Sequence, residues 1–373
     1  MVNPATSESL IKGIQLQRAR ELLQLTPNEV AQEISVDPQD VLSWENEESK
    51  PNLKQLEDLA KLYGRDIDYF LRETPVPPER LEFRGIKLGQ TLKDLAKEAL
   101  SVIGRFDELC RTTLELEKLL GKTREINLPN YRESDQPEEI AKRVRSEFGL
   151  DGRPIPQKPG LRTILSKRGV LIFELAVPEN AFSGFSLWHN EYGPCILLNG
   201  KDPTQRRNFT LAHELAHLVY RHNSGLCLIP QKIGESWIID LERKADQFAI
   251  EFLLPELGVI DDFRKRELTN QPSQDALAKM AYQKWGASIQ ALGFRLESLG
   301  LIRKGHTNTL FEIKTPFFKK SVTPTWERQL GNRFVSLAFE AHKKGIISSG
   351  KLAQTLDLPM RKALEEIHKR TGK

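Results

Sequence analysis

The sequence predicts a mostly helical α+β protein with more than one folded region. Most of the chain carries apolar residues at helical spacing, and several of these segments end in capping residues. Three short apolar runs bounded by Gly, Pro or Asn, at residues 169–176, 184–189 and 195–199, predict the strands of a small sheet. With 373 residues, the chain is long enough for two or three separate cores.

Composition places the chain among ordinary globular proteins. Hydrophobic residues make up 39% and charged residues 28% of it. It has no run of eighteen apolar residues and no basic segment followed by an apolar one at its start. We therefore expect neither a membrane span nor a secretory signal. Its three cysteines, Cys110, Cys195 and Cys227, are scattered, which argues against a disulfide framework and favours a cytoplasmic location.

Residues 1–72 are predicted to form a domain of five short helices. Thr26, with Glu29 three residues later, predicts a capping box. Asp37 is an N-cap before a proline, and Gly64 ends the fourth helix. The segments "ISVDP", "VLSWEN" and "KPNLKQLEDLAKLYG" of this region resemble the XRE-type helix-turn-helix domain.

The charge of this first domain makes DNA binding through it doubtful. From Glu21 to Ser49 there are eight acidic residues and no Lys or Arg. DNA affinity comes largely from neutralised phosphates, which the acidic side chains of the predicted recognition helix would repel. Gln39 and Ser43 on that helix can still read base edges, whereas Trp44 is expected in the core. A protein-interaction role, or docking onto a repressor of the same fold, stays open.

Residues 73–135 are predicted to be a linker and helical connector. Prolines at 75, 77 and 78 make a stiff non-helical segment, and an apolar stripe predicts a helix over residues 91–122. A second linker precedes Pro137. A domain is then expected over residues 136–303, containing the three strands and several helices.

The predicted helix at residues 203–222 carries the most informative motif. His213 and His217 are four residues apart and so lie on one helical face, where both imidazoles can bind a single ion. Glu214 points about 100° around the axis and can reach a metal-bound water without being a ligand. Three polar side chains on an otherwise apolar helix are costly without a partner. The motif therefore predicts a metal site.

A third ligand is expected from the predicted helix that ends at Pro255. Glu242 and Asp246 are four residues apart and flank its apolar face. We predict Glu242 as the ligand and Asp246 as the acceptor for the second ring N–H of a ligating histidine. Glu251 and Glu235 are the alternative ligands.

The segments "RRNFTLAHELAHLVYRH" and "ERKADQFAIEFLLP" resemble the ImmA/IrrE family of zinc metallo-endopeptidases. The order of an XRE-type domain followed by such a domain is similar too. The resemblance implies a zincin-like metallopeptidase with Zn²⁺ as cofactor, held by His213, His217 and Glu242, with Glu214 as the base. Ala216 stands where the family often has glycine.

Peptide hydrolysis is the reaction that this resemblance implies, and a donor to the oxyanion is then needed. Tyr220, His222 and His189 are the candidates. An extended substrate could add to the edge of the strand around residues 183–188. The resemblance further implies a protein substrate such as an XRE-type repressor, in stress response, mobile-element control or toxin–antitoxin regulation.

Two alternative functions remain. The chain could be a DNA-binding transcriptional regulator with a structural or sensory zinc site, in which Glu214 has no role. It could also be an antitoxin-like scaffold that uses only its helical surfaces and binds no metal.

Residues 304–373 form a basic C-terminal region that is predicted to be helical. From Arg303 onward there are 15 Lys or Arg and 6 Asp or Glu, although the whole chain has a formal net charge of only +4. Such a region can contact nucleic acid or an acidic partner, or can be a solvated helical surface. Residues 309–318 are expected to be a strand pair or an extended arm.

Overall fold

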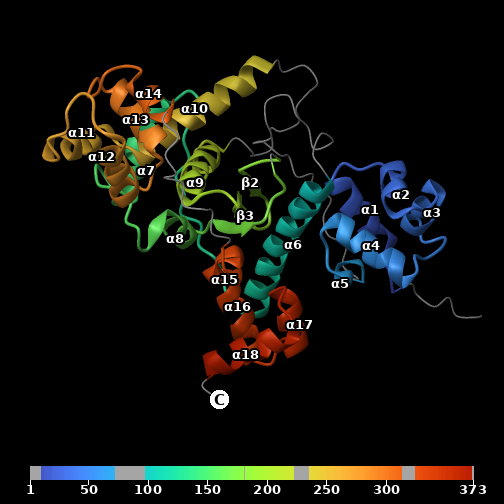
Figure 1. Cartoon of the computed structure of the whole chain (residues 1–373). Coiled ribbons are helices and arrows are strands. Elements are labelled where there is room, and N and C mark those ends of the chain that lie inside the picture. Colours follow the sequence, from blue (N-terminus) through green and yellow to red (C-terminus); the bar gives the residue numbers. More distant parts are fainter. Residues whose placement is uncertain (1–9, 72–96, 180, 222–234, 313–323, 372–373) are drawn as a thin grey trace, which may run out of the picture. The chain divides into compact units, whose positions relative to one another are not determined.

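The mostly helical α+β architecture is confirmed by a computed structural model of the chain (Figure 1). It describes residues 10–71, 97–179, 181–221, 235–312 and 324–371. The chain divides into two compact units, Met1–Thr112 with Val177–Ala181, and Thr113–Ala176 with Phe182–Lys373. None of the described helices is long and apolar enough to cross a membrane. The predicted connector around prolines 75–78 lies outside the described residues.

The first unit contains the five predicted short helices. They are α1 (Gly13–Leu22), α2 (Pro27–Ile34), α3 (Pro38–Glu45), α4 (Leu53–Tyr63) and α5 (Ile67–Phe70). The capping box of Thr26 and Glu29 is present, Asp37 caps α3, and Gly64 ends α4 with a φ of 63°. Trp44 is buried, as predicted. Local capping chemistry therefore sets the ends of these helices.

Helix α6 (Lys97–Leu119) begins in the first unit and completes its core. Arg65, just after α4, donates hydrogen bonds to Asp107 at 2.6 Å and Glu108 at 3.2 Å, and all three side chains are buried. A Cβ at Gly64 would overlap the carbonyl oxygen of Ser101, so only glycine permits this close approach of α4 and α6.

The second unit contains a sheet, a group of helices around it, and a C-terminal helical region. The elements up to residue 312 are α7 (Pro137–Glu147), α8 (Gly160–Lys167), β1 (Leu171–Leu175), β2 (Gly184–His189), β3 (Gly193–Asn199), α9 (Thr204–Val219), α10 (Glu235–Leu253), α11 (Glu256–Lys265), α12 (Gln274–Ala278), the π-helix η2 (Lys279–Trp285), α13 (Ile289–Ser298) and α14 (His306–Glu312). The C-terminal region contains α15 (Trp326–Leu330), α16 (Asn332–Lys343), α17 (Ser349–Thr355) and α18 (Met360–Thr371).

The three predicted strands form one mixed sheet in the order β1-β3-β2. β1 and β3 are parallel, with Leu171 opposite Cys195. β2 and β3 are antiparallel, with Ser186 opposite Ile196. Every residue of β3 is buried, which indicates that both faces of the central strand are covered.

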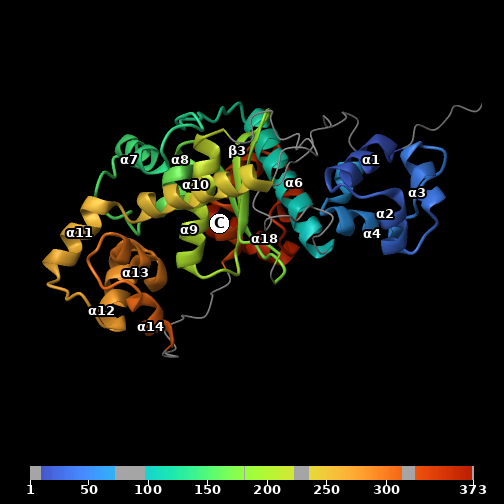
Figure 2. The same ribbon diagram turned by 90° about the horizontal axis from the view of Figure 1, so that it is seen from above.

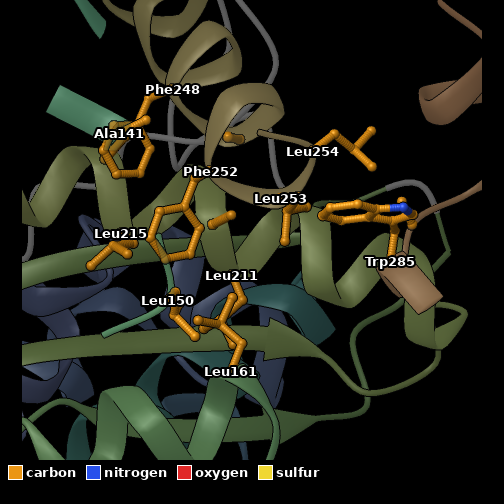
Figure 3. Packing of buried hydrophobic residues seen from close by; sticks show 14 of the residues in the cluster. Ala141, Leu150, Leu161, Leu211, Leu215, Phe248, Phe252, Leu253, Leu254 and Trp285 are labelled. Carbon is orange, nitrogen blue, oxygen red and sulfur yellow. The ribbon is translucent and has the colours of Figure 1, made fainter. Parts of the chain in front are cut away.

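Helix α9 covers one face of the sheet, and α10 packs against α9 (Figure 2). The apolar sides of α9 and α10 share one core with residues of α7, α8 and the sheet (Figure 3). Leu211 and Leu215 of α9 and Phe248 and Phe252 of α10 are fully or almost fully buried there. Burying each such side chain stabilises the fold by about 1.5–3 kcal/mol, so this core holds the two helices firmly together.

The other face of the sheet is covered by the C-terminal region. Phe173 of β1 packs edge-on against Phe334 of α16, with ring centroids 5.9 Å apart. The prediction of strand or extended arm over residues 309–318 is wrong for residues 309–312, which end α14. Glu297 accepts hydrogen bonds from the backbone N–H groups of Gly305 and Thr307 and so favours the helical start. Residues 313–318 lie outside the described part of the chain.

Candidate metal centre

His213, Glu214 and His217 lie in the second half of α9, where the helix is anchored on both sides. Its apolar residues pack into the shared core, whereas His213 contacts α10 and Glu214 contacts β2. Glu214 and His217 are 2% and 3% exposed, so their side chains are almost completely removed from solvent. Buried imidazole and carboxylate groups need partners, and α10 and β2 supply them.

His213, His217 and Glu242 bring three ligand atoms together from two helices. The two Nε2 atoms are 3.1 Å apart. The carboxylate of Glu242 lies 3.1 Å from His213 Nε2 and 3.5 Å from His217 Nε2. Tetrahedral coordination with bonds of about 2.0–2.1 Å places ligand atoms about 3.3 Å apart. The spacing of this donor set therefore fits one small divalent cation.

Asp246 contacts the opposite side of the His213 ring. Its Oδ1 lies 2.9 Å from His213 Nδ1, so Nδ1–H donates to the carboxylate and the lone pair of Nε2 points towards Glu242 and His217. Glu242 and Asp246 are one turn apart on α10, and both reach the same imidazole. This arrangement fixes the tautomer that a metal ligand requires.

Glu214 points towards the sheet, where it is hydrogen-bonded to Ser186 of β2. The Ser186 hydroxyl donates to Glu214 Oε2 at 2.7 Å. Ser186 lies directly opposite Ile196 of β3, so both side chains are on the same face of the sheet. Ile196 belongs to the shared core, which places this face towards α9. Burial raises the pKa of Glu214 to about 7, against the lowering effects of His213 and Ser186.

The carboxylates of Asp246 and Glu242 together have the largest net effect on the pKa of His213. Burial alone would lower the pKa of His213, but the hydrogen bonds with Asp246 and Glu242 outweigh it and raise the pKa to about 10. The site therefore attracts positive charge strongly. A bound cation would compete with the proton for Nε2 of this imidazole.

Two other predicted candidates, Tyr220 and His189, have hydrogen-bond partners outside the metal-binding group. The hydroxyl of Tyr220 donates to the carbonyl oxygen of Asp135 at 3.4 Å. His189 is buried and stacked on Tyr192, and its Nδ1 accepts from the backbone N–H of Glu191 at 3.1 Å. His222 lies outside the described residues.

One of the two alternative ligands, Glu251, is paired outside the metal-binding group. Glu251 forms an ion pair with Arg295 and accepts from the backbone N–H of Glu256. Glu235 is the first residue of α10. Glu242 is the carboxylate that the described structure groups with the two histidines.

Two acidic side chains of the predicted recognition helix and the residues just after it form hydrogen bonds within the first unit. Glu45 forms a bidentate pair with Arg20 at 2.7 and 2.8 Å, and Glu47 accepts from the backbone N–H of Gly13. Gln39 is exposed and Ser43 half-buried on this helix. The acidic residues of this region are thus not all free to repel phosphates.

Two comparisons with known families agree with the geometry. Residues 165–297 match the family model of the IrrE N-terminal-like domain, peptidase family M78. Residues 16–70 match a helix-turn-helix family model, in agreement with the resemblance of this region to the XRE-type domain. A comparison with curated proteins finds no match.

The IrrE-like segment contains the sheet, α9 and α10, and therefore all the residues of the metal-binding group. Sequence reasoning missed Ser186, because its contact with Glu214 depends on the register of β2 across the sheet. The alternation along β2 places Gly184, Ser186 and Trp188 on one face. A serine on a covered strand face was the available signal, but the sequence does not show which helix covers it.

Proposed function

We propose that the chain is a zinc-dependent endopeptidase with the metal held by His213, His217 and Glu242. The observation that carries the proposal is the approach of three donor atoms from α9 and α10 to within 3.1–3.5 Å of one another, next to a buried glutamate. The match of this segment to a peptidase family model supports it. Two histidines and a carboxylate leave a position for water or substrate on a tetrahedral zinc.

Zinc at this position would supply Lewis acidity, which polarises a peptide carbonyl and makes water acidic enough to attack near neutral pH. Glu214 accepts the proton of the attacking water and delivers it to the leaving amine nitrogen. Ser186 orients the Glu214 carboxylate through the hydrogen bond to Oε2. Asp246 orients His213 through Nδ1.

The substrate that we propose is a protein, presented as an extended segment. Among the described strands, β2 pairs with β3 alone and so is an edge strand of the described sheet. Backbone hydrogen bonds to that edge would align a peptide beside Ser186 and Glu214. A repressor of the XRE type is the proposed substrate, because the same chain carries a helix-turn-helix of that kind.

The test compares wild type with Glu214→Gln. Each would be co-expressed with an XRE-type repressor, and zinc would be measured in the pure proteins. We expect both proteins to contain one zinc, and only wild type to shorten the repressor. Glu139→Gln, an exposed glutamate on α7 paired with Lys142, is the matched control and should cleave normally.

A DNA-binding regulator with a structural or sensory zinc site is the alternative, favoured by the helix-turn-helix match. In that case Glu214→Gln would retain zinc and would behave as wild type in every assay, because Glu214 is not a ligand. An absence of stoichiometric zinc in wild type would contradict both functions.

A further inference from the structure

The C-terminal helices α16, α17 and α18 repeat the local design of α1, α2 and α3. Adding 322 to a residue number in the first set gives the equivalent residue in the second. Thr26 caps α2 by accepting from the N–H of Glu29, and Ser348 caps α17 by accepting from the N–H of Lys351 at 3.1 Å. The caps therefore coincide under this offset.

The buried positions coincide under the same offset. In the helix before the turn, Ala31 is 1% and Ala353 is 6% exposed. Each is preceded by a buried aliphatic residue, Val30 or Leu352, both 0% exposed. In the helix after the turn, the equivalent residues Val41 and Ala363 are also buried.

The turns have the same backbone conformation. Ser35 has a φ of 57° and Asp357 a φ of 52°, and each lies four residues after the equivalent alanine. A non-glycine residue in the left-handed region is uncommon, so its recurrence at the equivalent position is informative. α17 packs against both α16 and α18 (Figure 1). Two helices joined by such a short turn form a helix-turn-helix, with α18 in the place of the recognition helix.

The two three-helix segments, α1–α3 and α16–α18, differ most in charge. Residues 10–49 carry three Lys or Arg and eight Asp or Glu, whereas residues 332–371 carry eight Lys or Arg and four Asp or Glu. The outward positions of the helix after the turn show the change directly: Arg361 stands at the position of Gln39, and Lys362 at that of Asp40. Basic charge on this helix complements the phosphate backbone of a duplex.

One face of α18 is open and has a mixed surface suited to base edges. A surface hollow of about 740 Å³ is lined by Arg361, Leu364, Glu365, His368 and Lys369, which are spaced as one helical face. The side chains of Arg361 and Lys369 are 92% and 67% exposed. Arginine can bind guanine, an exposed leucine can contact the methyl group of thymine, and glutamate can accept from cytosine.

The opposite side of this three-helix unit is already occupied. Phe334 packs on Phe173 of the sheet, and Arg333 donates to Glu117 at 2.6 Å. The guanidinium of Arg370 lies over the ring of Phe339 and pairs with Glu327. The contacts of Phe334 and Arg333 attach α16 to the sheet and to α6, and those of Arg370 hold α18 against α16 and α15. The side chain of Arg361, on another part of α18, is 92% exposed.

We propose that α16–α18 is a second helix-turn-helix and that it binds double-stranded DNA through α18. Arg361 and Lys369 lie near opposite ends of the exposed face and are positioned to contact phosphates or base edges. The proposal does not depend on the peptidase activity, because none of its residues belongs to the metal centre.

The test uses the full-length protein and a labelled mixed-sequence duplex of about 30 base pairs, with binding measured by fluorescence anisotropy between 50 and 200 mM NaCl. Arg361→Ala/Lys362→Ala should weaken binding at least tenfold at 50 mM. It should also reduce the slope of log K against log salt by about two, since each phosphate contact contributes about 0.9. Both side chains are exposed, and thermal melting checks that the variant is folded.

Two control variants sharpen the result. Lys265→Ala/Lys279→Ala removes the same charge from exposed, i,i+4-paired lysines elsewhere in the second unit and should bind as wild type. Gln39→Ala/Ser43→Ala tests the first helix-turn-helix and should leave most of the binding intact.

The proposal is overturned if wild type does not bind the duplex at 50 mM NaCl, or if the α18 variant and the lysine control lose the same affinity. If only the α3 variant, Gln39→Ala/Ser43→Ala, loses affinity, the DNA-binding site lies in the first unit and the proposal is wrong. If wild type forms no DNA complex but captures a co-expressed repressor that the α18 variant loses, the face binds protein and the proposal is wrong.

Discussion

Ser186 of β2 donates its hydroxyl hydrogen to Glu214 of α9 across a distance of 2.7 Å, and both side chains are buried. This bond joins the edge strand of the sheet to the helix that carries both histidines. The strand that we propose to align the substrate therefore also orients the proposed base. A displacement of β2 would move both.

Ser186→Ala should lower kcat with little change in zinc content. A buried carboxylate loses a hydrogen bond worth about 1.5–3 kcal/mol, which corresponds to a decrease of about ten- to a hundredfold if the bond orients Glu214 in the transition state. The measurement is kcat and KM for repressor cleavage, together with zinc per protein. Ser183→Ala, whose hydroxyl accepts from Arg206, is the control. Equal kcat values for the two variants would contradict this role.

Asp246→Asn should weaken zinc binding by about ten- to a hundredfold, because loss of the carboxylate removes the acceptor that fixes the tautomer and basicity of His213. Competition against a chelating dye measures the affinity. Asp240→Asn alters a half-buried carboxylate on the same helix, paired with Lys244 at 3.0 Å, and should bind zinc as wild type. An Asp246→Asn protein with unchanged affinity would show that this hydrogen bond has no effect on the metal.

Features that depend on neighbouring residues could be predicted from the sequence. The caps of α2 and α3 and the left-handed end of α4 require only local chemistry, and all are present. The grouping of His213, His217 and Glu242 was accessible because helical spacing fixes two of the three ligands. Asp246 followed from its position one turn after Glu242.

Features that depend on long-range packing could not be predicted in this way. The strand order β1-β3-β2 and the contact of Ser186 with Glu214 need the register between segments far apart in sequence. Residues 309–312 include one β-branched and one aromatic residue, Thr309 and Phe311, yet they are helical in α14, which packs against α13. The equivalence of α17 with α2 needed the matching caps, buried positions and turn conformation of the structure.

Chelation should lower the thermal stability of the second unit. A ligand that binds only the folded state contributes about 4 kcal/mol when its concentration is a thousand times Kd, and the metal would join α9 to α10. The midpoint of thermal unfolding would be measured with and without EDTA. Glu242→Gln should begin with a lower midpoint and respond little to EDTA. A midpoint that falls equally in this variant would place the EDTA-sensitive metal elsewhere.

Glu174→Gln should destabilise the second unit more than substitution of Arg328, the exposed partner of Glu174. Glu174 is 1% exposed and pairs with Arg162 at 3.1 Å, Arg328 at 3.0 Å and Arg207 at 3.7 Å. Neutralising it leaves the desolvated guanidiniums without their counter-charge, which typically costs about 3–5 kcal/mol. Arg328→Ala removes a side chain that is 48% exposed and should cost less than about 1 kcal/mol. Urea unfolding of both variants measures the difference in the free energy of unfolding. Similar losses in the two would mean that Glu174 serves mainly to attach α15 to β1, and that the buried arginines are neutralised by their backbone acceptors.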